Sequence, residues 1–255
     1  MGDIVTMDDL TNQEIVAVLD DAERLVPVAR GDVYLPLLQG KVLANMFFEN
    51  STRTRMSFET AMKRLGGSVL NFTSIGTSVA KGETLYDTMQ MIDGYADVAA
   101  IRHPRQGAAQ YSADAVEIPI LNAGDGAGNH PTQTMLDLFT IRQAHGTLEG
   151  LNVVLVGDLR YGRTVHSLSH ALVRFGAKLT LVSPSTLKMP VEIVSDLREY
   201  GSEIMETESL EDQIAGADVI YVTRIQKERF PDEDEYAKVA GIYKIGVSNL
   251  SGAMK

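Results

Sequence analysis

The segment "VLANMFFENSTRTRMSFETAMKRLGG", residues 42–67, joins an apolar run to a helical pattern through a turn crowded with hydrogen-bond donors. The run "VLANMFF" is typical of a buried strand, and "MSFETAMKRLGG" alternates apolar and polar residues at helical spacing. Between them, a serine, two threonines and two arginines fill the five positions 51–55. A strand that turns directly into a helix is the building unit of a parallel α/β sheet.

The same alternation of strand and helix runs along the rest of the chain. An opening helix is predicted over residues 11–26, where Thr11 and Glu14 have the spacing of a capping box. Four apolar residues share one face of this helix: Ile15, Leu19, Ala22 and Leu25. Short β-rich runs predict strands at 42–48, 68–72, 97–101, 118–122, 151–157, 178–183, 202–206 and 218–223. Helical patterns lie between them, at 54–65, 83–93, 131–145, 163–175 and 191–200.

This order predicts an α/β fold with two doubly wound domains and parallel sheets. The helix "PTQTMLDLFTIRQAHG" ends at Gly146, and a second αβ series follows it. We therefore expect a first domain over residues 1–130, a connecting helix over 131–149 and a second domain over 150–255. The last strand-like run, 241–250, stops five residues before the end of the chain, so the second domain is expected to be incomplete at its C-terminus.

Composition narrows the class of protein. The chain has 255 residues, 44% of them apolar, and a formal charge of -11, which argues against nucleic acid or an anionic membrane as a partner. It has no cysteine, no membrane-length apolar run and no signal-peptide pattern, so a soluble, cytoplasmic protein is the simplest class. Any anion that it binds must be held by a local cluster of cations.

Such clusters occur where ligands of open α/β sheets bind, beyond the carboxyl ends of the strands. The segments that follow predicted strands are rich in cationic and hydroxylic residues: "ENSTRTR", "RHPRQG", "NAGDGAGNHPTQ", "GDLRYGR" and "RIQKER". No His-acidic metal spacing and no Gly-x-Ser-x-Gly elbow is present in the sequence. The pattern predicts a site that stabilises negative charge and does little covalent chemistry.

Residues 51–54 are the strongest candidates, because a helix N-terminus, hydroxyls and an arginine fork together favour an anion. The alternative is an ordinary N-capped helix with solvated arginines. His130 and Gln133 lie three residues apart at a helix start, and Arg102 follows an apolar strand; for these, capping or surface roles are the alternative.

Two further segments have features of known loop types. In "SVAKGETLYDT", Ser78 and Lys81 lie in a loop ahead of a helix, so Lys81 is either a solvated charge or a mobile anion ligand. "GDLRYGRT", residues 157–164, has the glycine spacing of a phosphate loop, but Arg163 replaces the lysine and the intervening residues are bulky. A nucleotide hydrolase is therefore disfavoured.

Taken together, the motifs resemble the transcarbamoylase family and, within it, the aspartate carbamoyltransferase catalytic chains. The resemblance covers essentially the whole chain and follows the family's order, through "FFENSTRTRMSFETAMKRLGG", "SVAKGETLYDT", "RHPRQGAA", "LNAGDGAGNHPTQTMLDLFTI", "GDLRYGRTVHSL" and "TRIQKERF". S-T-R-T-R and H-P-T-Q are shared with ornithine carbamoyltransferases. The Lys-Gly-Glu-Thr, Gly-Arg-Thr-Val-His and Arg-x-Gln-Lys-Glu-Arg blocks favour aspartate.

The resemblance implies a role for each candidate residue. Ser51, Thr52, Arg53 and Thr54 would hold the phosphate of carbamoyl phosphate, and Arg102, His130 and Gln133 its carbamoyl end. The catalytic set would be Arg53, Thr54, Arg102 and His130. Arg163, Arg224 and Gln226 would hold the aspartate carboxylates, and Ser78 and Lys81 would come from a neighbouring subunit, with Lys81 also contacting aspartate. No metal or cofactor is expected.

The implied function is transfer of the carbamoyl group from carbamoyl phosphate to L-aspartate in pyrimidine biosynthesis, by a homotrimer that some relatives combine with a regulatory chain. The family continues past residue 255 with a His-Pro-Leu-Pro-Arg loop and a closing helix that this sequence lacks. The alternatives are a carbamoyltransferase for another amino acid and an impaired chain that binds anions or assembles with active copies.

Overall fold

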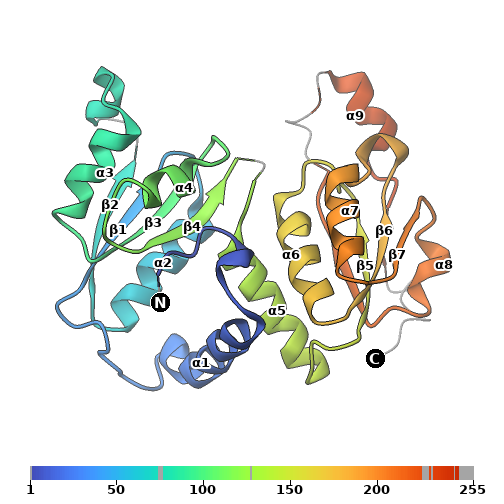
Figure 1. Cartoon of the computed structure of the whole chain (residues 1–255), viewed down its shortest axis with the longest axis horizontal. Helices are drawn as coiled ribbons and strands as arrows, with labels where there is room; N and C mark the ends of the chain where they lie inside the picture. Colours follow the sequence, from blue (N-terminus) through green and yellow to red (C-terminus); the bar gives the residue numbers. More distant parts are fainter. Residues whose placement is uncertain are drawn as a thin grey trace. The chain divides into compact units, whose positions relative to one another are not determined.

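The computed structural model describes residues 2–73, 77–126, 128–225, 230, 232–243 and 245–246. The chain forms two compact units, Met1–Phe139 and Thr140–Lys255, and each is described by itself (Figure 1). The boundary between them falls inside the connecting helix predicted over 131–149. The three-part division predicted from the sequence stays a prediction.

The first unit is built on a parallel sheet with the strand order β2-β1-β3-β4. Within the described residues its strands are β1 (Val42–Phe47), β2 (Ser68–Thr73), β3 (Val98–His103) and β4 (Ile120–Asp125). Its helices are η1 (Met7–Asp9), α1 (Asn12–Arg30), α2 (Thr52–Arg64), η2 (Ser78–Lys81), α3 (Leu85–Asp93), α4 (Ala108–Ala113) and α5 (Pro131–His145). Because β2 lies on one side of β1 and β3 on the other, the winding direction reverses between β1 and β3.

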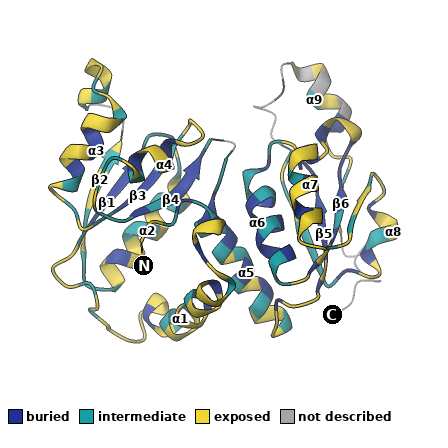
Figure 2. Cartoon of the chain, viewed as in Figure 1, coloured by how far each residue is buried: buried dark blue, intermediate teal, exposed yellow. Residues whose placement is uncertain are grey.

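Both faces of this sheet are covered, as the alternation of side chains along a strand requires. On one face, Ala44 and Met46 of β1 pack with Met89 and Ile92 of α3. On the other face, Leu43 packs with residues that include Met62 and Phe58 of α2. Figure 2 shows the central strands as buried, whereas β2 at the edge alternates exposed and half-buried residues.

The second unit repeats the plan, with the strand order β7-β6-β5-β8 and parallel pairing throughout. Within the described residues its strands are β5 (Asn152–Val156), β6 (Lys178–Val182), β7 (Ile204–Thr207) and β8 (Val219–Val222). Its helices are α6 (Arg163–Arg174), η3 (Ser185–Leu187), α7 (Val191–Glu199), α8 (Glu211–Ile214) and α9 (Glu233–Val239). The reversal of winding here falls between β5 and β8.

The two parallel sheets with flanking helices confirm the predicted fold class. Each predicted strand from 42–48 to 218–223 is present with small shifts at its ends, and α5 has the predicted bounds. Thr11 and Glu14 form the expected capping box on α1, where Ile15 and Leu19 are buried. The short helices α4, α8 and α9 were not predicted, because so few residues show no helical period.

The predicted run 241–250 lies partly outside the described residues, and its described positions are not in a strand. Among the residues that the structure describes, we find no helix long and apolar enough to cross a membrane.

Gly157 lets the ends of β5 and β8 approach each other at the reversal point of the second sheet. Its φ of 120° lies in the region that side chains disfavour, and a Cβ placed there would be 2.2 Å from the carbonyl oxygen of Thr223. The Thr223 amide donates to the Val156 carbonyl at 2.8 Å, so this oxygen belongs to a strand end that is itself held in place. The clash is with backbone, which has little room to yield.

We predict that Gly157→Ala lowers the free energy of unfolding of the second unit by about 2–4 kcal/mol, from backbone strain together with overpacking. Gly176→Ala is the matched control. Gly176 has a φ of 73°, but no described atom lies within 4 Å of the point that its Cβ would occupy, so only the strain of about 1 kcal/mol applies. Urea unfolding followed by circular dichroism measures both. Equal losses in the two variants would contradict the close approach.

Candidate active site

The first candidate site lies where β1 and β3 end side by side. Phe47 and Arg102 are paired in the parallel register, and the Phe48 amide donates to the Arg102 carbonyl at 2.8 Å. The chain then leaves β1 and enters α2 at Ser51, only a few residues further on. The reversal point of the sheet therefore brings the predicted turn 51–54 and Arg102 to neighbouring strand ends, where ligands of such sheets bind.

The N-terminus of α2 has no side-chain cap within the described part of the chain. Ser51 occupies the N-cap position with extended backbone and makes no capping hydrogen bond, and the first turn of α2 holds no acidic residue. By contrast, Thr11 with Glu14 caps α1, and Thr84 caps α3 with Asp87 in its first turn. The partial positive charge of the α2 terminus is thus left for a ligand, and Arg53 is exposed beside it.

Arg102 is held in place by Glu49, which the sequence did not single out. The Arg102 Nε donates to Glu49 Oε1 at 2.6 Å, and Nη2 lies 2.6 Å from the same oxygen. Its Nη1 donates to the carbonyl oxygen of Ala123 at 3.3 Å, and the Arg102 side chain is only 14% exposed. The guanidinium is therefore oriented by both neighbouring strand ends, β1 and β4. Glu49 was overlooked because nothing in its sequence position reveals the partner across the sheet.

The loop after β4 places His130 at the start of α5. Its Nδ1 lies 3.3 Å from Thr132 Oγ1, and the residue is buried. Gln133 donates its side-chain amide to Asp137 Oδ1 at 3.0 Å, one turn along α5. Asp125, a residue missed from the sequence, shapes this loop by accepting from the Asn129 amide at 2.7 Å and from the Gly107 amide at 2.8 Å.

His103 follows Arg102 at the same strand end and packs its ring against Phe48, with ring centroids 5.0 Å apart. Burial lowers the pKa of His103, and its Nδ1 accepts a hydrogen bond from the Arg105 amide at 3.0 Å. The imidazole is thereby used for packing and loop structure. Of Arg102 and His103, Arg102 is the one whose polar group is held at the strand ends, by Glu49 and Ala123.

Ser78 and Lys81 lie on η2. They line a pocket of about 540 Å³ together with other residues of the first unit: Phe72, Thr77, Ala80, Glu83 and Met91. Among the described residues, this lining contains none of those predicted to bind carbamoyl phosphate. Phe72 of this lining packs its ring against that of Phe48, with centroids 5.0 Å apart, so the pocket adjoins the segment that follows β1.

The second candidate site lies at the reversal point between β5 and β8. Arg163 is the first residue of α6, whose N-cap is Gly162, and within the described residues this terminus also lacks a side-chain cap and an acidic residue. Asp158 holds the preceding loop by accepting from the amides of Tyr161 at 3.0 Å and Arg160 at 3.2 Å. Arg224 follows β8 and is exposed. Gln226, the third predicted aspartate ligand, lies outside the described residues.

His166 ties α6 to the same loop. Its Nε2 is 2.8 Å from the carbonyl oxygen of Leu159, and because a carbonyl only accepts, Nε2 carries the proton. Burial lowers the pKa of His166, which favours the neutral ring. The loop before Arg163 is therefore held by Asp158, through the amides of Arg160 and Tyr161, and by His166, through the Leu159 carbonyl.

The fold, with its two parallel α/β units, is that of a carbamoyltransferase. The chain belongs to the aspartate/ornithine carbamoyltransferase family: the family's carbamoyl-P binding domain matches residues 2–143, and its Asp/Orn binding domain matches residues 149–255.

Individual relatives are aspartate carbamoyltransferase catalytic subunits. That of Methanothermobacter thermautotrophicus is 52% identical over 97% of this chain and 80% of its own length, and that of Methanococcoides burtonii is 55% identical over 98% and 81%. The catalytic subunit of M. jannaschii aspartate transcarbamoylase superposes with a TM-score of 0.91 at 49% identity, over 99% of this chain and 83% of that one. Aspartate transcarbamoylase from Trypanosoma cruzi, in complex with carbamoyl phosphate and aspartate, gives a TM-score of 0.93 at 40% identity, over 100% and 83%.

We predict that His166 makes the second unit less stable as the pH falls. Its pKa is lowered from 6.5 in the folded state, so below pH 6.5 the unfolded chain binds a proton that the folded chain does not. Between pH 7.5 and 5.5 this costs at most about 1.4 kcal/mol of unfolding free energy. In His166→Gln, whose amide can still donate to Leu159, that part of the pH dependence should vanish. Parallel urea titrations at the two pH values measure it, and identical pH slopes in the two proteins would refute it.

Proposed function

We propose that the protein transfers the carbamoyl group of carbamoyl phosphate to the amine of L-aspartate, giving N-carbamoyl-L-aspartate and phosphate in de novo pyrimidine biosynthesis. One observation carries this proposal: the uncapped N-terminus of α2 lies at the same strand ends as Arg102, whose guanidinium Glu49 and Ala123 hold in place. Membership of the family and the substrates bound to the T. cruzi relative support it.

In this proposal the phosphate group of carbamoyl phosphate binds at the start of α2. Backbone amides and hydroxyls of residues 51–54 donate to its oxygens, and Arg53 supplies a positive charge beside them. Thr54, Arg102 and His130 donate to the carbonyl oxygen, and Gln133 contacts the carbamoyl amide. This arrangement leaves the carbonyl carbon open to attack and neutralises the leaving group before the reaction begins.

The reaction then needs little beyond electrostatics. The neutral amine of aspartate attacks the carbonyl carbon, and the C=O electron pair moves onto oxygen to form a tetrahedral oxyanion. When the oxyanion collapses, the bond from carbon to the phosphate oxygen breaks and its electron pair leaves with phosphate, which also takes the proton lost by the amine. Arg102, Thr54 and His130 stabilise the oxyanion, which is the charge that develops only in the transition state.

Aspartate binding is assigned to the second unit. Arg163 lies in the segment that follows β5, and Arg224 in the segment that follows β8. Each would pair with one carboxylate of aspartate, and Gln226 and Lys81 would supply further contacts. The same arginines disfavour ornithine, whose side chain carries a positive charge where the site requires a negative one. An acceptor other than a dicarboxylic amino acid is therefore the weaker alternative.

We further propose that the active form is a cytoplasmic homotrimer in which Ser78 and Lys81 act on a neighbouring copy. Ser78 and Lys81 are exposed on η2, where they are accessible to a neighbouring copy, and this supports the arrangement. An exposed apolar segment with Val33, Tyr34 and Leu37 gives the first unit a surface suited to contact with another copy. A regulatory chain, as some relatives bind, would add to this trimer.

The two substrate sites are expected to respond separately to substitution. Arg53→Ala should weaken carbamoyl phosphate binding by about 10- to 100-fold, the loss of charge-assisted hydrogen bonds. Arg163→Ala should leave that affinity within about threefold and weaken aspartate binding instead. Calorimetry with each ligand, with and without a chelator, measures both effects. The exposed Arg24→Ala and Arg198→Ala are the matched controls in the two units.

If Arg53→Ala binds carbamoyl phosphate with the same affinity as the parent protein, the assignment of the first site is wrong. If Arg163→Ala has unchanged aspartate affinity, the assignment of the second site is wrong.

Mixing two inactive variants tests the shared site. Lys81→Ala and Arg53→Ala trimers, dissociated briefly and reassociated in equal amounts, should regain about a quarter of the parent activity, because a quarter of the interfaces then pair an intact Lys81 with an intact Arg53. Each variant taken alone through the same treatment is the control. Mixed trimers that form without activity would show that Lys81 serves its own subunit or none.

A further inference from the structure

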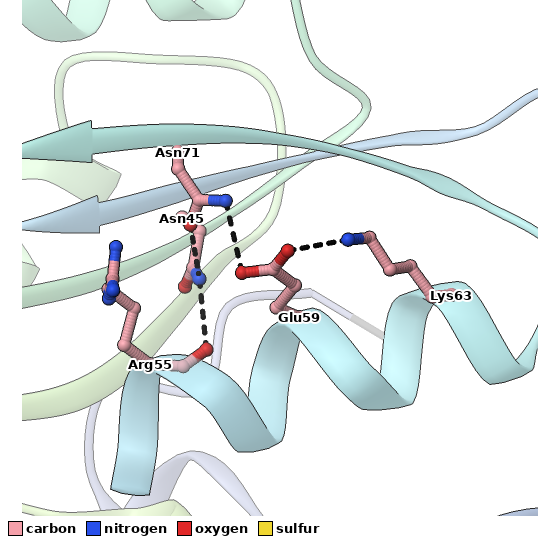
Figure 3. Close-up of polar contacts among 5 residues, drawn as sticks. All are labelled: Asn45, Arg55, Glu59, Lys63 and Asn71. Carbon is pink, nitrogen blue, oxygen red and sulfur yellow. Dashed lines mark hydrogen bonds and ion pairs between the residues drawn. The ribbon is translucent and has the colours of Figure 1, made fainter. Parts of the chain in front are cut away.

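β1 carries a buried amide in an otherwise apolar strand. Asn45 is fully buried at the centre of β1, where its side chain points to the same face as Leu43. Its Nδ2 donates to the Arg55 carbonyl oxygen at 3.0 Å and lies 3.1 Å from Asn71 Oδ1 (Figure 3). One side chain thus links the strand that enters the candidate site to the first turn of α2.

A second link runs from the neighbouring strand to the same helix. Asn71 is the register partner of Asn45 on β2, and its Nδ2 donates to Glu59 Oε2 at 3.1 Å (Figure 3). Lys63 donates to Glu59 Oε1 at 2.6 Å. The hydrogen bonds from Lys63 and then Asn71 lower the pKa of Glu59, so its carboxylate stays charged and continues to accept from Asn71.

The Asn45 amide is not there for stability. Its Oδ1 is buried without a hydrogen-bond partner among the described residues, and a buried polar atom that finds no partner destabilises the folded state. The Arg55 carbonyl already lies within α2, so a leucine at position 45, whose side chain has the same branching, would fill the core without leaving that carbonyl unpaired. What the amide adds is a fixed direction for the backbone of α2 at Arg55.

That direction matters for the anion site. Arg55 directly follows Thr54, and the backbone amides of residues 52–54 precede it in the same helical turn. Successive peptides of a helix share one orientation. Holding the Arg55 carbonyl against β1 therefore also fixes the direction of these amides and the backbone position from which the Arg53 side chain extends. Binding of a small anion by several donors at once depends on such alignment.

We propose that Asn45 is a positioning residue for the anion-binding turn 51–54, acting through the Arg55 carbonyl and oriented by Asn71; this inference rests on the proposed function. It makes no contact with the substrate itself. The arrangement separates two properties that usually change together, since the amide improves ligand binding while its unpaired oxygen lowers stability.

Asn45→Leu tests the inference with inorganic phosphate and carbamoyl phosphate as probes in calorimetry. The dissociation constants of both should rise about 3- to 10-fold, the range expected for one neutral hydrogen bond. Urea unfolding should show the variant to be at least as stable as the parent protein. A purely structural role predicts the opposite coupling, in which affinity falls only when stability falls.

Asn71→Ala is the second variant, since its exposed position on the edge strand makes it safe for folding. It removes the acceptor that orients Asn45 and should raise both dissociation constants about 2- to 4-fold. Lys63→Gln, at the far end of the network, is the matched control and should stay within about twofold of the parent. If Asn45→Leu does not fold, Asn71→Ala alone decides.

The outcomes separate this inference from the proposed function. A parent protein that binds neither probe removes the proposed first site and the positioning role with it. A parent that binds both, with Asn45→Leu and Asn71→Ala binding equally well, leaves the site in place and overturns only the role of Asn45. Weaker binding in Lys63→Gln as well would show a general effect of surface charge and would also overturn it.

Discussion

Parallel pairing on both sides of one strand is the constraint on which each half of this molecule depends. β1 pairs in parallel with β2 on one side and with β3 on the other, and β5 does the same with β6 and β8. In the first unit, the chain that leaves β1 runs to β2 and the chain that leaves β3 runs to β4, so the two connections lead away from each other. The ends of the two diverging strands remain uncovered by their own connections, and a helix N-terminus opens there. This strand order brings Arg102 beside the turn 51–54 in the first unit, and the segments with Arg163 and Arg224 to neighbouring strands in the second.

The electrostatics of the chain follow from that geometry. With a net charge of -11, the protein as a whole repels anions, yet the described helices at the two reversal points begin without an acidic residue or a side-chain cap. The helices α1 and α3 carry a threonine cap and an acid in the first turn, whereas the short helix α4 also lacks both. At a helix terminus that binds an anion, a side-chain acceptor would compete with the ligand for the same amides, so the uncapped starts of α2 and α6 suit the role proposed for them.

The sequence was informative wherever structure follows from local pattern. Strand runs, the α1 capping box and the positions of residues 51–54, Arg102 and Arg163 at strand ends could all be predicted, because period, spacing and neighbouring turn residues determine them. The partners of those residues could not. Glu49 meets Arg102, and Asp125 meets Gly107, only after strands distant in sequence have paired in register. A single sequence does not indicate which side chains will pair across a sheet. From the sequence alone, Asn45 is only a polar residue within an apolar run.

The two reversal points hold their ligand-binding turns by different physical means. In the first unit a side chain does it, since the Asn45 amide reaches from β1 to the helix backbone. In the second unit a glycine and two side chains do it: Gly157 allows β5 to lie against Thr223, Asp158 accepts from the amides of the loop before Arg163, and His166 bonds to the Leu159 carbonyl. A side-chain link can be replaced without disturbing the sheet, whereas a glycine contact cannot accept any larger residue. The turn of the second unit therefore includes a contact that no larger residue can replace, whereas the link through Asn45 can be tested by substitution at one buried position.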